Sequence, residues 1–197
     1  ELSLEDMLGY ALLGESVASG DVHGDNVTPC MYGGLTLTRA LDPIDVVRIP
    51  VPESTYCVLV KPDLRIDTEE ARRVIPRKLP LSDYVHQSAN LAGFLAGCYR
   101  RDTDMIRRSL SDMLIEPHRA PLIRGFGRVR TAALDANALG CSISGSGPSV
   151  FAWCEGQACA DAVREAMVSA FGQEDVDAQA WVSSIEVPGA TIVEPAA

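Results

Sequence analysis

A glycine- and serine-rich turn is the strongest chemical signal in the sequence, and it reads Ile143-Ser-Gly-Ser-Gly-Pro-Ser-Val150. Two glycines around a serine permit positive φ angles and a close backbone approach, so successive N–H groups can point inward and bind an anion. Phosphate and carboxylate groups both suit such a nest. The turn lacks the Gly-Lys-Ser/Thr of a Walker loop and the third glycine of a dinucleotide fingerprint. It is therefore interpreted as either an anion-binding turn or a purely structural one.

A carboxylate on the apolar side of the first predicted helix is the second signal. The apolar stripe of this helix, continued at its own spacing, reaches Glu15. An isolated buried charge is costly, so this carboxylate must be paired, protonated or bound to a metal. The following loop adds His23, Asp25 and Asn26 beside a glycine, which forms a polar cluster. The alternative is a helix-end glutamate that accepts hydrogen bonds from loop amides.

Two arginines have neighbours that suit the recognition of a carboxylate. Thr68 and Arg72 stand four residues apart and share one helix face, where a hydroxyl and a guanidinium can hold one carboxylate together. The alternative partner of Arg72 is the neighbouring Glu69. Arg119 lies in the segment Glu116-Pro-His-Arg-Ala-Pro121 and is a second candidate anion clamp, unless it is simply solvated.

Apolar periodicity and helix caps predict the elements that position these residues. Ser3 with Asp6 has the pattern of a capping box, which opens the first helix. The predicted helices are 4–19, 68–74, 82–99, one that begins at 103, 121–137 and 158–171; the predicted strands are 33–38, 56–61, 149–154 and 178–187. Strands at both ends of a helix-rich middle predict a layered α+β fold, with a domain boundary near residue 50.

Composition excludes several classes of function. The chain has 197 residues, 17 basic and 27 acidic side chains and a net charge of -10, which disfavours binding to nucleic acid or to an anionic membrane surface. No apolar run approaches the roughly 18 residues of a membrane-spanning helix. Six cysteines without a CxxC pair predict reduced, buried thiols and a cytoplasmic protein.

Five motifs, taken in order, resemble homoserine kinases of the GHMP small-molecule kinase superfamily. They are HGDNVTPCMYGG, DTEEARRVIP, SANLAGF, EPHRAPLIRGF and GCSISGSGPSVFA, and together they extend over nearly the whole chain. The SGSGP turn is shared across the superfamily, whereas the other candidate residues look specific to homoserine kinases. The resemblance implies an N-terminal ATP-binding domain and a ferredoxin-like C-terminal domain. We accordingly expect residues 1–50 to complete the first domain and residues 51–197 to form the second.

The resemblance also implies a role for each candidate residue. Glu15 looks like the acidic residue that holds Mg²⁺, and Asp25 is a second catalytic candidate, with His23 beside it as another possible base. The residues that match homoserine-binding positions are His23, Asn26, Thr68, Arg72, Arg119 and Gly145. Ser144, Ser146 and Gly147 match the part of the turn that supports the phosphate-binding loop. Asn90 stands where some relatives carry histidine.

The activity implied by the resemblance is transfer of the γ-phosphoryl group of ATP to the side-chain hydroxyl of L-homoserine. The product is O-phospho-L-homoserine, an intermediate of threonine synthesis, and Mg²⁺ is the expected cofactor. The family's glycine- and serine-rich phosphate-binding loop is not found in this sequence. We therefore expect the chain to correspond to the C-terminal portion of a homoserine kinase and to be inactive alone. A homodimer is compatible with the resemblance.

Two other functions remain open at this point. One is another GHMP kinase that acts on a sugar or a mevalonate-like alcohol. The two arginines favour an amino acid over a neutral sugar, because a guanidinium matches a carboxylate. The other is a non-catalytic module that binds an amino acid, in which Glu15 has no metal to hold.

Overall fold

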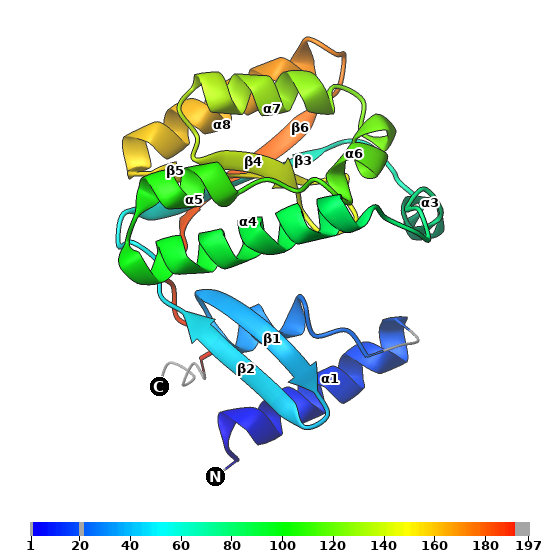
Figure 1. The fold of residues 1–197 in the computed structure, drawn as a ribbon, viewed down its shortest axis with the longest axis vertical. Helices are drawn as coiled ribbons and strands as arrows, with labels where there is room; N and C mark the ends of the chain where they lie inside the picture. Colours follow the sequence, from blue (N-terminus) through cyan, green and yellow to red (C-terminus); the bar gives the residue numbers. More distant parts are fainter. Residues whose placement is uncertain (1, 20–21, 192–197) are drawn as a thin grey trace, which may run out of the picture. The chain divides into compact units, whose positions relative to one another are not determined.

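The structure is a computed structural model that describes residues 2–19 and 22–191 (Figure 1). Its internal contacts separate two compact units. Unit 1 is formed by the chain up to Val51 together with a segment that begins at Ile185, and unit 2 is Pro52–Ser184. The α+β class expected from the sequence is confirmed. The expected domain limits at residues 50 and 51 stay a prediction.

Unit 1 combines two helices with a two-stranded antiparallel sheet. The helices α1 (Leu4–Ser19) and α2 (Val27–Tyr32) pack against each other, and α2 contacts β1 (Leu35–Leu41). The second strand, β2 (Ile44–Ile49), pairs with β1 along its length. The α1 helix is one that the sequence predicts correctly at both ends.

The capping box at the start of α1 is confirmed. Asp6 N donates to Ser3 Oγ at 3.1 Å, and Ser3 N donates to Asp6 Oδ2 at 3.0 Å. These two bonds satisfy amide groups that a helix start would otherwise leave unpaired. The pattern involves residues three apart, so the sequence alone is enough to predict it.

The segment after Ile185 returns to unit 1 and pairs with its first part. Gly33 and Pro188 form an antiparallel bridge, and Ala190 N donates to Cys30 O at 2.9 Å. An Arg48–Glu186 ion pair with an N–O distance of 3.1 Å adds a side-chain contact. Unit 1 is therefore built from two separate stretches of the chain.

A four-stranded sheet is the centre of unit 2. Its strands are β3 (Thr55–Pro62), β4 (Gly140–Ile143), β5 (Val150–Glu155) and β6 (Ala178–Ser184), in the spatial order β4-β5-β3-β6 with antiparallel pairs. Val58 on β3 lies opposite Ala152 on β5 and Val182 on β6. One helix lies immediately before β4 in the chain, and another lies immediately before β6. Together with this strand order, they form the pattern of a ferredoxin-like fold.

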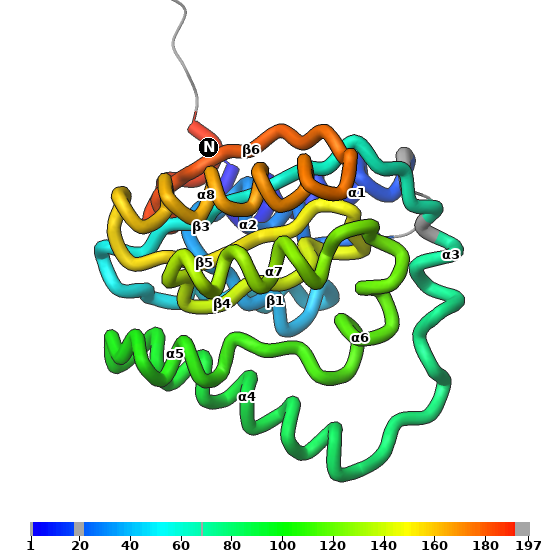
Figure 2. Tube along the Cα trace, turned by 90° about the horizontal axis from the view of Figure 1, so that it is seen from above, coloured from blue at the N-terminus to red at the C-terminus, as the bar shows by residue number. Residues whose placement is uncertain are grey.

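Two helices cover one face of this sheet and enclose the core. They are α7 (Phe126–Asp135) and α8 (Gln157–Gly172), which lie side by side in the view of Figure 2. Alternate strand residues meet the apolar stripes of both helices, as a half-buried sheet requires. The core includes Val58, Val60, Val129, Val150, Val163, Met167 and Phe171, all fully buried.

Four helices and a 3₁₀ turn fill the chain between β3 and α7. They are α3 (Thr68–Arg73), α4 (Leu81–Arg100), α5 (Thr103–Ser109), α6 (Glu116–Arg119) and the 3₁₀ turn Ala120–Leu122. The α4 and α5 helices pack together on the side of the sheet opposite α7 and α8 (Figure 1). Phe94 on α4 contacts Trp153 on β5, with ring centroids 5.1 Å apart. No helix in the described part of the chain is long and apolar enough to cross a membrane.

Several element boundaries differ from those expected from the sequence. The loop that contains HGDN leads into α2, and the stretch after Pro43 forms the strand β2. The helix expected over 121–137 starts at Phe126, because the residues around Pro121 form a 3₁₀ turn first. Gly140–Ile143, read as the approach to the turn, is the strand β4. Pairing with a distant strand, rather than local pattern, defines β4.

Candidate active site

Arg119 joins two of the predicted substrate-binding segments in unit 2. Its Nε donates to the carbonyl oxygen of Ala71 on α3 at 3.2 Å, and its Nη1 donates to the carbonyl oxygen of Gly145 at 2.8 Å. Hydrogen bonds from a charged donor are stronger than neutral ones. The interpretation of Arg119 as a merely solvated side chain is therefore wrong: it holds α3 and the glycine-serine turn together.

The glycine-serine turn is closed by its own backbone. Gly147 N donates to Ser144 O at 3.0 Å, and Ser144 N donates to Ser149 O at 2.8 Å. Gly145 and Gly147 have φ angles of +57° and +85°, in the left-handed region that favours glycine. Within the described ranges, the N–H groups of Gly145 and Ser146 donate to no protein acceptor. This arrangement is compatible with the predicted anion nest, whose ligand stays a prediction.

The two glycines of the turn have different surroundings. A Cβ on Gly147 would lie 3.1 Å from Ile123 Cδ1 and 3.3 Å from Ile143 Cγ2, whereas a Cβ on Gly145 would have no atom within 4 Å. Gly147 therefore anchors the turn on apolar side chains. At Gly145 the added Cβ would point into open space.

The α3 helix presents Arg72 beside the carbonyl that Arg119 binds. Asp67 caps the helix by accepting a hydrogen bond from Glu69 N at 2.9 Å. The Glu69 carboxylate pairs with Arg73 at 3.0 Å, so the alternative pairing of Glu69 with Arg72 is not formed. Arg72 is exposed, while the neighbouring Ala71 is fully buried. The backbone of Thr68 starts this helix, but its side chain lies outside the described ones.

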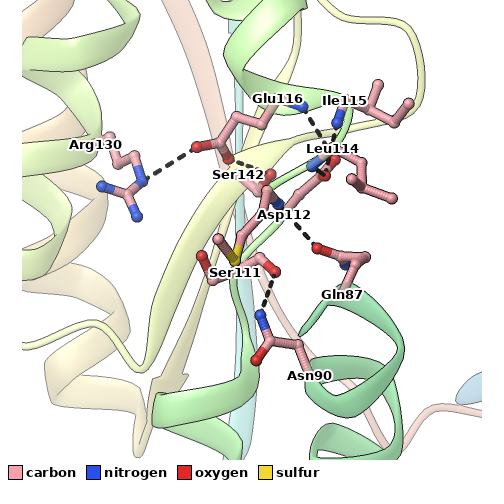
Figure 3. Close-up of polar contacts among 10 residues, drawn as sticks. Gln87, Asn90, Ser111, Asp112, Leu114, Ile115, Glu116, Arg130 and Ser142 are labelled. Carbon is pink, nitrogen blue, oxygen red and sulfur yellow. Dashed lines mark hydrogen bonds and ion pairs between the residues drawn. The ribbon is translucent and has the colours of Figure 1, made fainter. Parts of the chain in front are cut away.

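A partly buried carboxylate at the start of α6 contacts two other elements (Figure 3). Glu116 Oε2 accepts a hydrogen bond from Ser142 Oγ on β4 at 2.5 Å, and Glu116 Oε1 lies 3.4 Å from Arg130 Nε on α7. The side chain is only 12% exposed. Burial raises the pKa of Glu116 above its ordinary value, and the contacts with Ser142 and Arg130 oppose this rise.

Asp112 organises the turn that leads into α6 (Figure 3). Its carboxylate accepts hydrogen bonds from the backbone N–H groups of Leu114, Ile115 and Glu116 at 2.9, 2.8 and 3.1 Å. Gln87 Oε1 on α4 accepts a further bond from Met113 N at 2.8 Å. Such caps fix the chain before a helix. Nearby, Asn90 Nδ2 donates to Ser111 O at 3.4 Å, which joins α4 to the same segment.

The remaining candidate residues lie in unit 1. Glu15 is half-buried on α1 and His23 is half-buried before α2, whereas Asp25 and Asn26 are exposed. The backbone of their loop is fixed, since Thr28 N donates to the carbonyl oxygen of Gly24 at 2.9 Å. Among the described residues, no three His, Cys, Asp or Glu side chains are grouped to hold a metal ion.

The cysteines are free thiols, and their burial varies. Cys141 and Cys154 are buried in the core of unit 2, and burial raises the pKa of Cys141 to about 12. Cys30 is exposed, so the expectation that all six are buried is wrong for this residue. The buried thiols stay protonated and serve as small apolar side chains.

The first comparisons with known proteins show which class of protein has this fold. The family described as "GHMP kinases C terminal" matches residues 94–173. The solved mevalonate kinase of L. major, in complex with R-mevalonate, superposes with a TM-score of 0.69 at 16% identity, over 97% of this chain and 60% of that one. At this identity the likeness shows the fold alone. The fold is that of GHMP kinases.

Closer relatives then narrow the class. The chain is 47% identical to the homoserine kinase of Xylella fastidiosa strain M12 over 192 residues, which are 98% of this chain and 59% of the relative. The crystal structure of homoserine kinase from Cytophaga hutchinsonii superposes with a TM-score of 0.90 at 43% identity, over 93% of this chain and 58% of that one. The resemblance to homoserine kinases is thereby confirmed. The chain spans less than two thirds of either relative.

Three residues that contact one another at the start of α6 were not predicted from the sequence. Glu116, Ser142 and Arg130 belong to three separate elements, and their contacts become visible only in the folded chain. One signal was present: Glu116 precedes Arg119 by three residues, as Ser142 precedes Gly145.

Proposed function

We propose that the complete protein that carries this chain is a homoserine kinase, which transfers the γ-phosphoryl group of ATP to the side-chain hydroxyl of L-homoserine. The observation that carries the proposal is the contact of Arg119 with both α3 and the glycine-serine turn. Through this contact, the segment that carries Arg119, the α3 helix and the glycine-serine turn lie together, and all three contain predicted substrate-binding residues. The identity to named homoserine kinases over 98% of the chain supports the same substrate.

Arg119 and Arg72 have the chemistry to bind the carboxylate of homoserine. A guanidinium has five N–H donors, and the two carbonyl contacts of Arg119 use donors on Nε and Nη1 only. The donors on Nη2 remain for a ligand. Arg72 is exposed one residue after Ala71, so it can approach the same ligand from α3. The two cations would fix the amino acid end and leave its hydroxyl to react.

Phosphoryl transfer depends mainly on positioning and on neutralising charge. The turn contributes the N–H groups of Gly145 and Ser146, which are placed to stabilise negative charge on a phosphate or carboxylate oxygen. Asp25 and His23 are our candidates to accept the hydroxyl proton, and Asn26 our candidate for a further substrate contact. Ser144, Ser146 and Gly147 are our candidates to support the phosphate-binding loop.

Glu15 fits the expected role of a magnesium ligand. Its carboxylate is a hard oxygen donor, and Mg²⁺ is usually held by one or two carboxylates together with substrate phosphates and water. Mg²⁺, when bound there, would neutralise charge on the phosphates of ATP. We further propose a cytoplasmic location and assembly as a homodimer.

A coupled assay of ADP release tests the substrate. The complete protein, with Mg-ATP, should turn over L-homoserine far faster than mevalonate or galactose. Equal or faster turnover of either competitor would overturn the assignment. A calorimetric titration with homoserine distinguishes the kinase from a non-catalytic amino-acid-binding module. Binding of homoserine with no ADP release at any Mg²⁺ concentration would indicate the binding module.

A further inference from the structure

The short helix α6 is attached to one neighbouring segment at both of its ends. At its start, Glu116 accepts the 2.5 Å hydrogen bond from Ser142. At its end, Arg119 donates the 2.8 Å hydrogen bond to the carbonyl of Gly145. Arg119 follows Glu116 by three positions along the chain, and Gly145 follows Ser142 by three. The two contacts therefore fix the register of α6 against the end of β4 and the turn that follows it.

The contact at the start of α6 has little freedom to move. The Glu116 side chain is 12% exposed and is held between β4 and the Arg130 guanidinium of α7 (Figure 3). Its backbone N–H is bonded to Asp112 at 3.1 Å. A buried carboxylate with these partners orders its surroundings, because losing any partner leaves a polar group unsatisfied.

The contact at the end of α6 has a different character. Arg119 reaches across to two carbonyl oxygens, and these belong to segments 48 and 26 residues away in the chain. The four-residue helix α6 cannot fix the position of the Arg119 side chain by its own stability, because isolated helices of this length do not persist in water. The position of the Arg119 guanidinium therefore depends on what holds the helix.

We propose that Glu116 is a positioning residue for Arg119: its contact with Ser142 sets where the guanidinium stands for the carboxylate of the substrate. This inference rests on the proposed function. In this proposal Glu116 bonds to Ser142 and Arg130 and not to the substrate. It acts on substrate affinity through α6, and Ser142 is its partner in the same action.

Removal of the carboxylate tests the proposal in the complete protein. Glu116→Ala should raise KM for L-homoserine about tenfold while kcat and KM for ATP change less than about twofold, and tenfold corresponds to about 1.4 kcal/mol. Glu116→Gln, which keeps an oxygen for Ser142 Oγ, should restore part of the affinity. Ser142→Ala should raise the same KM and is a second test if Glu116→Ala does not fold.

The matched control is Glu174→Gln. Glu174 pairs with Arg128 on α7, the helix that also carries Arg130, with an Nε–Oε1 distance of 2.6 Å, and its side chain is 27% exposed. Breaking this pair should leave KM for homoserine unchanged. An equal rise in KM for this control, or an unchanged KM in both Glu116→Ala and Ser142→Ala, would overturn the positioning role.

The pH dependence of KM gives a readout that a general loss of stability would not move. The charged or titratable groups around Glu116 are Asp112, Arg130 and Cys141. As pH falls and Glu116 takes up a proton, its pairing with Arg130 weakens, so KM for homoserine should rise in the wild type. Glu116→Gln should lack this component, and an identical profile in both proteins would contradict the proposal.

Failure of the positioning role and failure of the proposed function give different results. Wild-type protein that releases no ADP with homoserine refutes the function. Active wild type with unaltered Glu116 and Ser142 variants refutes only the positioning role. A crystal structure of Glu116→Ala provides the direct check, because the Arg119–Gly145 hydrogen bond should lengthen or be lost.

Discussion

The two regions that carry candidate site residues are built in opposite ways. In unit 2, Arg119 is bonded to Ala71 and Gly145, and its helix is secured through Glu116. In unit 1, backbone bonds fix the loop before α2, while Asp25 and Asn26 are exposed. In the first region a candidate substrate-binding side chain also holds the fold, whereas Asp25 and Asn26 in the second are exposed on a loop held by backbone bonds. Substitution of Arg119 should therefore affect fold and activity together, and substitution of Asp25 or Asn26 should affect activity alone.

The largest effect is expected for Arg119→Ala. The change removes two charge-assisted hydrogen bonds and a proposed substrate contact, so kcat/KM for homoserine should fall about a hundredfold or more. The free energy of unfolding should fall as well. Steady-state kinetics and urea unfolding measure the two effects. Loss of activity with unchanged stability would show that the two carbonyl bonds do not hold the segments together.

Asp25→Asn should separate activity from stability in the other region. Asp25 is exposed, so its substitution should change the free energy of unfolding by less than about 0.5 kcal/mol. If Asp25 assists proton transfer, kcat should fall at least about tenfold. The same two measurements apply. Near-normal kcat would remove Asp25 from the catalytic candidates.

The turn offers a comparison within unit 2 itself. Gly147→Ala should lower the free energy of unfolding by about 2 kcal/mol, because its positive φ and the 3.1 Å approach of Ile123 both disfavour a Cβ. Gly145→Ala meets only the backbone cost, about 1 kcal/mol. Thermal unfolding of both variants ranks them. Equal losses would mean that contact with the core adds nothing at Gly147.

The smallest effect concerns the pH dependence of stability. The pKa of Glu116 is raised in the folded state, so the folded protein binds this proton more tightly than the unfolded chain does. The contribution of Glu116 to the free energy of unfolding is complete below the pKa of a glutamate in the unfolded chain, about 4.3. It is lost as the pH rises through the higher pKa of Glu116 in the folded protein. Unfolding followed across mildly acidic pH should show this fall. Glu116→Gln should flatten it, and an unchanged slope would contradict the assignment.

The sequence predicted features that depend on near neighbours. The capping box of Ser3 and Asp6 and the cap at Asp67 involve residues two or three apart, and both are confirmed. The strands β2 and β4 were missed, because the first is interrupted by charges and the second is four residues long. Strand identity here comes from pairing with another strand, which local pattern does not contain.

The candidate site shows the same limit. The sequence identified Arg119 and the turn as separate features, but it did not predict that they are in contact. The partners of Arg119 lie 48 and 26 residues away, and Ser142 lies 26 residues from Glu116. Contacts at these separations depend on how α6 packs against β4. The roles assigned to single residues in both units stay predictions until the variants are measured.

The return of the chain to unit 1 has a consequence for synthesis. Gly33 bridges Pro188, and Ala190 bonds Cys30, so these contacts wait until the ribosome has made all of Pro52–Ser184. Unit 2 is one uninterrupted stretch and can fold as soon as it emerges, since domains generally fold as units during translation. The portion of unit 1 that precedes Pro52 is thus completed only after unit 2 has been made, and α2 spends that interval without the segment that pairs with its end.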